Sequence, residues 1–164
     1  MSRAVGNTLP DILLERLSGR DLPARMGQAI LITTTDSQGW PHPALLSYGE
    51  MVAVDATRLR LATYRTSGTS GNMRRNGKLT LCFIDEGMTY YIKVHVREEQ
   101  DPMAGFPELA RFGATVEQVL VDQAREDLEP GAGVTGGITF HLGRPADEVL
   151  RGWQAVVGGL RRDS

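Results

Sequence analysis

A stretch of eight residues near the middle of the chain alternates strictly between two sets of side chains. One set is Tyr90, Ile92, Val94 and Val96, and the other is Tyr91, Lys93, His95 and Arg97. Successive side chains of a β-strand point to opposite faces of its sheet, so this pattern predicts a strand with one buried face. The other face is expected to contact water or a partner.

Further short apolar runs predict a chain that is mainly β. They lie at residues 28–35, 44–48, 51–54, 59–63, 79–84, 115–121 and 138–142, and glycines and prolines supply the turns between them. Helices are expected at about 9–18 and about 145–160, with a short one within 64–76 and one or two turns at 122–128. Because no long helix separates consecutive strands, a β-barrel with flanking helices is predicted in place of a parallel sheet.

Length and charge limit the organisation of the chain. Its 164 residues are expected to form one domain, 1–164, with the barrel at about 28–142. A net charge of −2 gives no reason to expect nucleic acid or a membrane surface as partner. No apolar run reaches membrane-spanning length and no signal-peptide pattern is present, so a cytoplasmic location is expected.

The remaining reactive residue types form no recognisable motif. Cys82 is the only cysteine and lies in an apolar run, so it is expected to be a buried thiol. The histidines, His42, His95 and His141, do not have the spacing of metal ligands, and no metal site is expected. His42 lies between two prolines, where a structural role is the alternative to a functional one.

The segment between the strands at 59–63 and 79–84 has the composition of an anion-binding turn. Hydroxyl side chains cluster in it, glycines allow close approach of the backbone, and a helix start would add free amides. The candidate ligands are Thr66, Ser67, Thr69 and Ser70, with Arg65, Arg74 and Arg75 as nearby cations. The alternative interpretation is a flexible polar loop followed by a solvated helix end.

Two short motifs flank this turn. The first is Asp36-x-x-Gly39-x-Pro41-His42, and the second is Asn72-x-x-Arg75-Asn76, just before a new strand. In order and spacing they resemble the FMN-binding split-barrel family, the pyridoxamine 5'-phosphate oxidase-like proteins, over about residues 10–97. The resemblance implies an antiparallel split barrel of Greek-key type, and a homodimer with FMN in the cleft between the subunits. It also places Tyr91 near the dimer interface.

The same resemblance implies where FMN would bind. Family members hold the FMN phosphate in the turn after the third strand, with a serine followed by an arginine–lysine pair. The serine corresponds to Ser67 and the strand-end threonine to Thr63, whereas the basic pair falls on Gly68 and Thr69. Arg65, Arg74 or Arg75 would then have to supply the missing charge. The backbone around Pro43, Ala44, Leu45 and Ser47 would line the flavin ring.

These features lead to one functional hypothesis and two alternatives. The first is a flavin-dependent oxidoreductase that acts on an unknown small substrate, with no identifiable catalytic side chain. The second, prompted by the missing basic pair, is a noncatalytic dimeric barrel that binds a flavin, deazaflavin or tetrapyrrole. The third is a reductase that uses a deazaflavin. Pyridoxamine-phosphate oxidase activity is not expected, because the arginine motif that binds substrate near the C-terminus of those enzymes has no match here.

Overall fold

One antiparallel sheet forms most of the molecule. The computed structural model describes residues 1–163, and its sheet has the order β3-β2-β6-β7-β8-β5-β4, with β1 also paired to β8. The strands are β1 (Ser2–Gly6), β2 (Ala29–Thr35), β3 (Pro41–Ser47), β4 (Met51–Ala53), β5 (Arg58–Tyr64), β6 (Lys78–Asp85), β7 (Met88–Gln100) and β8 (Leu109–Asp122). The prediction of a mainly β, antiparallel chain is therefore confirmed.

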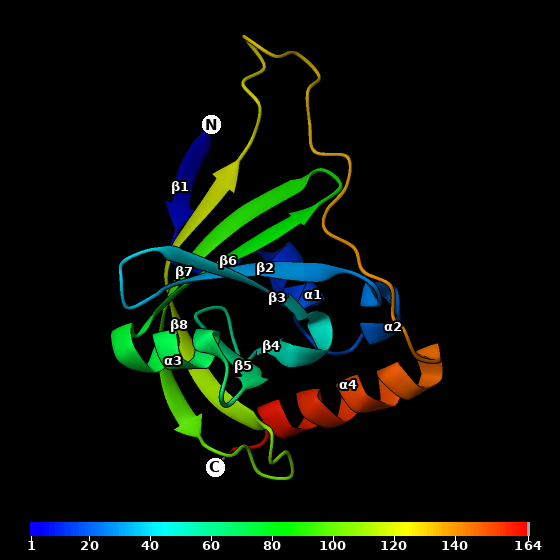
Figure 1. The fold of residues 1–164 in the computed structure, drawn as a ribbon. Coiled ribbons are helices and arrows are strands. Elements are labelled where there is room, and N and C mark those ends of the chain that lie inside the picture. The colour runs from blue at the N-terminus through cyan, green and yellow to red at the C-terminus, as the bar shows by residue number, and fades with distance from the viewer. Residues whose placement is uncertain (164) are drawn as a thin grey trace.

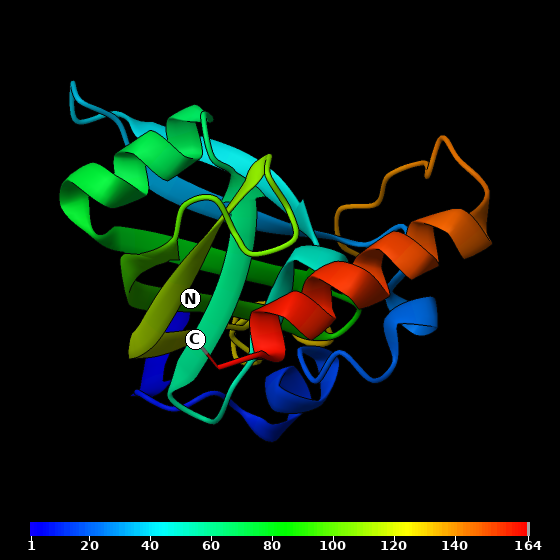
Figure 2. The same cartoon turned by 90° about the horizontal axis from the view of Figure 1, so that it is seen from below.

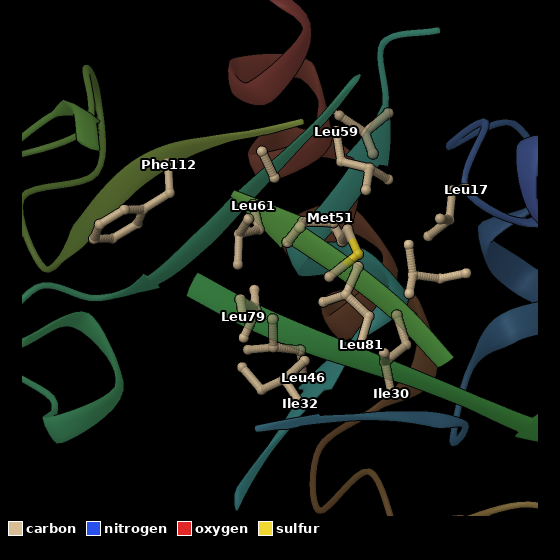
Figure 3. Packing of buried hydrophobic residues seen from close by; sticks show 14 of the residues in the cluster. Leu17, Ile30, Ile32, Leu46, Met51, Leu59, Leu61, Leu79, Leu81 and Phe112 are labelled. Atoms are coloured by element: carbon tan, nitrogen blue, oxygen red, sulfur yellow. The ribbon is translucent and has the colours of Figure 1, made fainter. Parts of the chain in front are cut away.

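The sheet curls because the two strands at its ends are close together in the sequence. β3 and β4 lie at opposite ends of the strand order, yet only the 3-10 helix η1 (Tyr48–Glu50) separates them in the chain. The sheet must bend round to bring them together, which gives the half-barrel seen in Figure 1. Its inner face holds the core, where Ile30, Ile32, Leu61 and Leu81 are fully buried, as Figure 3 shows.

The alternating pattern in the middle of the chain has the predicted effect. Ile92, Val94 and Val96 of β7 are buried, whereas Lys93 and His95 are exposed. β7 and β8 are longer than predicted, because residues expected to form a surface crossing continue the ladder. In that extension Glu98 pairs with Phe112 and Gln100 pairs with Arg111.

Four α-helices cover the half-barrel. They are α1 (Asp11–Arg16), α2 (Leu22–Arg25), α3 (Gly68–Asn76) and α4 (Ala146–Arg161). α3 packs against β2, β5 and β7, whereas α4 packs against η1, β4 and β5. Figure 2 shows the two helices on different parts of the sheet. Among the described residues, no helix is both long and apolar enough to cross a membrane.

Two further local predictions were wrong, and one strand was missed. β1 was not predicted, because its short polar sequence becomes a strand only by pairing with β8. Residues 138–142 do not form a strand, since only an isolated bridge between Thr139 and Gln28 links them to the sheet. Residues 122–128 form no helix and begin a long irregular segment that returns to α4, drawn in yellow and orange in Figure 1.

Two arginines from the sheet hold the C-terminal end of α4. Nη1 of Arg111 donates to the carbonyl of Arg162 at 2.8 Å, and Nη1 of Arg60 donates to the carbonyl of Leu160 at 3.1 Å. Cations at a helix C-terminus are favoured by the helix dipole. The Nε atoms of Arg111 and Arg60 lie 3.0 and 3.1 Å from Oε2 of Glu99. Glu99 therefore balances the buried charge of Arg111 and the partly buried charge of Arg60.

Candidate functional site

An apolar groove of about 630 Å³ lies between β3, the end of β5 and α4. β3 contributes Leu45, Leu46 and Ser47 to it, and β5 contributes Tyr64. The lining includes two charged residues, Glu50 and Arg144. Most of its other members are aromatic or aliphatic: Phe106, Leu109, Phe140, Leu142, Val149, Trp153 and Val156. A concave, mostly apolar site of this size is typical of small-molecule binding.

The groove owes its shape to a glycine in η1. Gly49 is buried, and a Cβ atom at that position would overlap the indole ring of Trp153. The missing side chain therefore lets α4 approach the junction of β3 and β4. On the other side of the groove, Leu45 is 53% exposed and Tyr64 is 65% exposed. Both large side chains are therefore accessible to a ligand.

A buried carboxylate fixes the end of β3. One carboxylate oxygen of Glu50 accepts hydrogen bonds from the amide of Ser47 at 2.6 Å and from its hydroxyl at 2.9 Å. Burial raises the pKa of Glu50 above its ordinary value, although the two hydrogen bonds from Ser47 oppose the shift. Ser47, which the sequence placed near the flavin ring, is thus bonded within its own turn.

The raised pKa of Glu50 predicts a pH effect on stability. Because the folded state binds this proton more tightly than the unfolded state, its contribution is complete below the unfolded pKa and is lost as pH rises through the folded pKa. We expect Glu50→Gln to gain stability relative to the parent as pH increases. Urea unfolding of both proteins between about pH 4 and 7 measures this difference. A difference that stays constant with pH would contradict it.

The hydroxyl groups of the predicted anion-binding turn are brought together, but most of them bond to one another. Oγ1 of Thr63 lies 2.6 Å from Oγ of Ser70, and Ser70 Oγ donates to the carbonyl of Tyr64 at 2.7 Å. Ser67 is the N-cap of α3, because its Oγ accepts a hydrogen bond from the amide of Ser70 at 3.1 Å. Thr69 is buried, whereas Thr66 is exposed.

The turn nevertheless offers donors to an anion. In the part of the chain that the structure describes, the amides of Gly68 and Thr69 donate to no other group, since they lie in the first turn of α3. Both amides lie at the positive end of the helix dipole. Together with the exposed hydroxyl of Thr66, they form a small donor surface.

The arginines near the turn have protein partners. Nε of Arg65 lies 2.7 Å from a carboxylate oxygen of Asp101. Arg74 pairs with Glu98 at 2.6 Å and with Asp101 at 3.3 Å, and it also donates to the carbonyl of Arg65. Two carboxylates thus balance two of the candidate cations.

The third arginine and a histidine lie on the other side of α3. Arg75 donates to the side-chain oxygen of Asn72. His42 of β3 packs against the start of α3: a Cβ atom added to Gly68 would lie 3.4 Å from both Cε1 and Nε2 of its ring. The sequence marks His42 by its flanking prolines and as the last residue of the motif that begins at Asp36. Its contact with Gly68 is long-range and carries no sequence signal.

The other predicted lining residues of β3 are divided between its two faces. Pro43 and Leu45 are exposed, and Ala44 is partly buried against the core. Leu45 and Ser47 line the groove. Tyr91 lies on the outer face of β7, where its hydroxyl donates to Asp122 at 3.1 Å.

An antiparallel sheet curled into a half-barrel, with helices at its ends, is the architecture of split-barrel proteins. A proposed pyridoxamine 5'-phosphate oxidase from Lactobacillus delbrueckii has this fold with a TM-score of 0.57 and 18% identity, over 73% of this chain and 98% of the other. The chain belongs to the pyridoxamine 5'-phosphate oxidase family, whose model matches residues 25–132. The resemblance noted in the sequence is thus confirmed.

Two further relatives extend the comparison. The uncharacterized protein YclD of Bacillus subtilis strain 168 is 31% identical over 156 residues, which cover 95% of this chain and 97% of YclD. An FMN-binding protein from Syntrophomonas wolfei shares the fold with a TM-score of 0.52 and 14% identity, over 70% of this chain and 90% of the other. The match to YclD spans nearly the full length of both proteins.

Proposed function

We propose that this chain binds FMN, with the phosphate at the start of α3 and the flavin ring in the apolar groove. One observation carries the proposal: Tyr64 lines the groove, and its carbonyl accepts hydrogen bonds from the amide of Ser67 and the hydroxyl of Ser70. The groove therefore adjoins the donor surface at the helix start. Membership of the family and the shared fold with an FMN-binding protein support the same ligand.

The residues present fit the two ends of this cofactor. The amides of Gly68 and Thr69 and the hydroxyl of Thr66 would hold the phosphate. Leu45 and Tyr64 would contact the ring, which would lie against the wall formed by α4. When bound, the flavin would supply hydride or electron transfer to a small substrate, and the protein would position it and exclude water. This assignment makes the chain a flavin-dependent oxidoreductase.

We further propose that a second copy of the chain covers the groove. Leu45 and Tyr64 remain largely exposed in the single chain, and exposed apolar surface of this kind marks interfaces or ligand sites. A homodimer would enclose the flavin ring between its subunits.

A noncatalytic ligand-binding protein is the second candidate. It is favoured by the pairing of Arg65 and Arg74 with Asp101 and Glu98, because these arginines are then engaged before any cofactor phosphate arrives. Such a protein would hold a flavin, deazaflavin or tetrapyrrole without turning it over. Bound flavin that no physiological electron donor reduces would select this candidate.

Titration of the purified protein with FMN, followed by flavin fluorescence, tests the proposal. We expect one FMN per chain, and we expect Leu45→Glu to weaken binding at least about tenfold, because it places a charge against the apolar ring. Leu128→Glu is the matched control, since Leu128 is 66% exposed and lies outside the groove. Absence of FMN binding by the parent, or equal affinity of the Leu45→Glu variant, would reject this site. Parallel titrations with a deazaflavin and a haem identify the alternative ligands.

A further inference from the structure

We propose that His42 takes the place of the missing basic pair and binds the cofactor phosphate beside Gly68. This inference rests on the proposed binding of FMN. It adds a side chain that can carry positive charge to the amides and the Thr66 hydroxyl already assigned to the phosphate.

The ring of His42 lies beside Gly68, where the family has a basic residue. The family's basic pair falls on Gly68 and Thr69 in this sequence. A Cβ atom added at Gly68 would lie 3.4 Å from both Cε1 and Nε2 of His42, which is van der Waals contact. The imidazole of a neighbouring strand thus lies next to the point at which a side chain at residue 68 would begin.

The two ring nitrogens of His42 are available to bind a ligand. In residues 1–163 the imidazole of His42 makes no hydrogen bond, whereas its backbone is fixed by pairing with Thr34 and by two flanking prolines. A histidine held in place with both nitrogens unused is preorganised for a ligand. Nε2 lies beside Gly68, whose amide is one of the two free amides at the start of α3.

Charged side chains lie near the ring of His42. Asp36, which directly follows β2, is close enough to interact with His42 and with Arg75 on α3. Asp36 accepts hydrogen bonds from the amides of Trp40 and Gln38, which lower its pKa, so it stays a carboxylate. Arg75 offsets that negative charge. Nothing in this pair prevents a protonated or neutral imidazole from donating to a phosphate oxygen.

The test compares the affinities of FMN and riboflavin, which differ only in the phosphate. We expect the parent to prefer FMN, and His42→Ala to reduce this preference by about tenfold or more with little change for riboflavin. His42→Phe is the matched control for packing, since it keeps a ring against Gly68 and is expected to lose the same preference. The double variant His42→Ala/Gly68→Arg should recover it, because the arginine gains the vacated space.

Each outcome has a separate meaning. An unchanged FMN preference in both His42 variants, with flavin still bound, would overturn the role of His42 and leave the proposed function intact. A parent that binds FMN and riboflavin equally would overturn the phosphate site. A parent that binds neither flavin would overturn both proposals. Circular dichroism of each variant verifies that it is folded, and a misfolded His42→Ala is replaced by His42→Phe.

Discussion

Replacing Glu99 with alanine is expected to lower the free energy of unfolding by about 3–5 kcal/mol. Its carboxylate is shared by the guanidinium groups of Arg60 and Arg111, and the side chain of Arg111 is 1% exposed. Removal of the carboxylate would take away the negative charge that the two clustered guanidinium groups share in a poorly solvated place. The same cations hold the last carbonyls of α4, so that helix end should loosen as well.

Urea unfolding monitored by circular dichroism measures this loss. Glu117→Ala is the control, because Glu117 is 64% exposed and pairs only with His95 at the surface of the sheet. A surface substitution of this kind is expected to change stability by less than about 0.5 kcal/mol. If both variants lose similar amounts, Glu99 does not have the role described.

Gly49→Ala is expected to lower the free energy of unfolding by about 1–3 kcal/mol, because the new methyl group overlaps the ring of Trp153. The clash would push α4 away from η1, which it contacts closely. The groove would change shape at the same time, because Gly49 and Trp153 both line it. This substitution is therefore expected to reduce FMN affinity together with stability.

A double-mutant cycle with Trp153→Ala separates the clash from other effects. Removal of the indole makes room for the methyl group, so the double variant should be less destabilised than the sum of the two single variants. Gly152→Ala is a control on the same helix, since no atom lies within 4 Å of a Cβ added there. Strict additivity of Gly49→Ala and Trp153→Ala would show that the two residues do not clash.

The motifs that indicated the family from sequence have structural roles, one within a turn and one between segments far apart in the chain. Oδ1 of Asp36 accepts the amides of Gln38 and Trp40 and so forms the turn between β2 and β3. Asn72 and Asn76 donate to Thr34 and to the carbonyl of Thr35, which ties α3 to β2. Each motif needs particular residue types at a fixed spacing, and this is why the sequence alone could predict the strands, α3 and the turn.

The remainder depends on contacts between distant parts of the chain. The hydroxyls of Thr63 and Ser70 were read as ligands, yet they bond to each other across the turn. The approach of His42 to Gly68 and the wall that α4 gives the groove join segments that no sequence pattern relates. Residues 138–142 have the composition of a strand, but only the first residue of β2 bonds to them: the amide of Ala29 donates to the carbonyl of Ile138. The amide of Phe140 donates to Gly27, which precedes β2.

The three-residue η1 has a consequence for how the chain can vary in length. It joins both ends of the sheet, it contains the glycine that admits Trp153, and Glu50 in it bonds back to β3. An inserted residue in η1 would move the ends of β3 and β4 apart. The same insertion would change the shape of the groove. Length changes are better tolerated in the irregular segment after β8. The length of η1, in contrast, is fixed by the closure of the half-barrel.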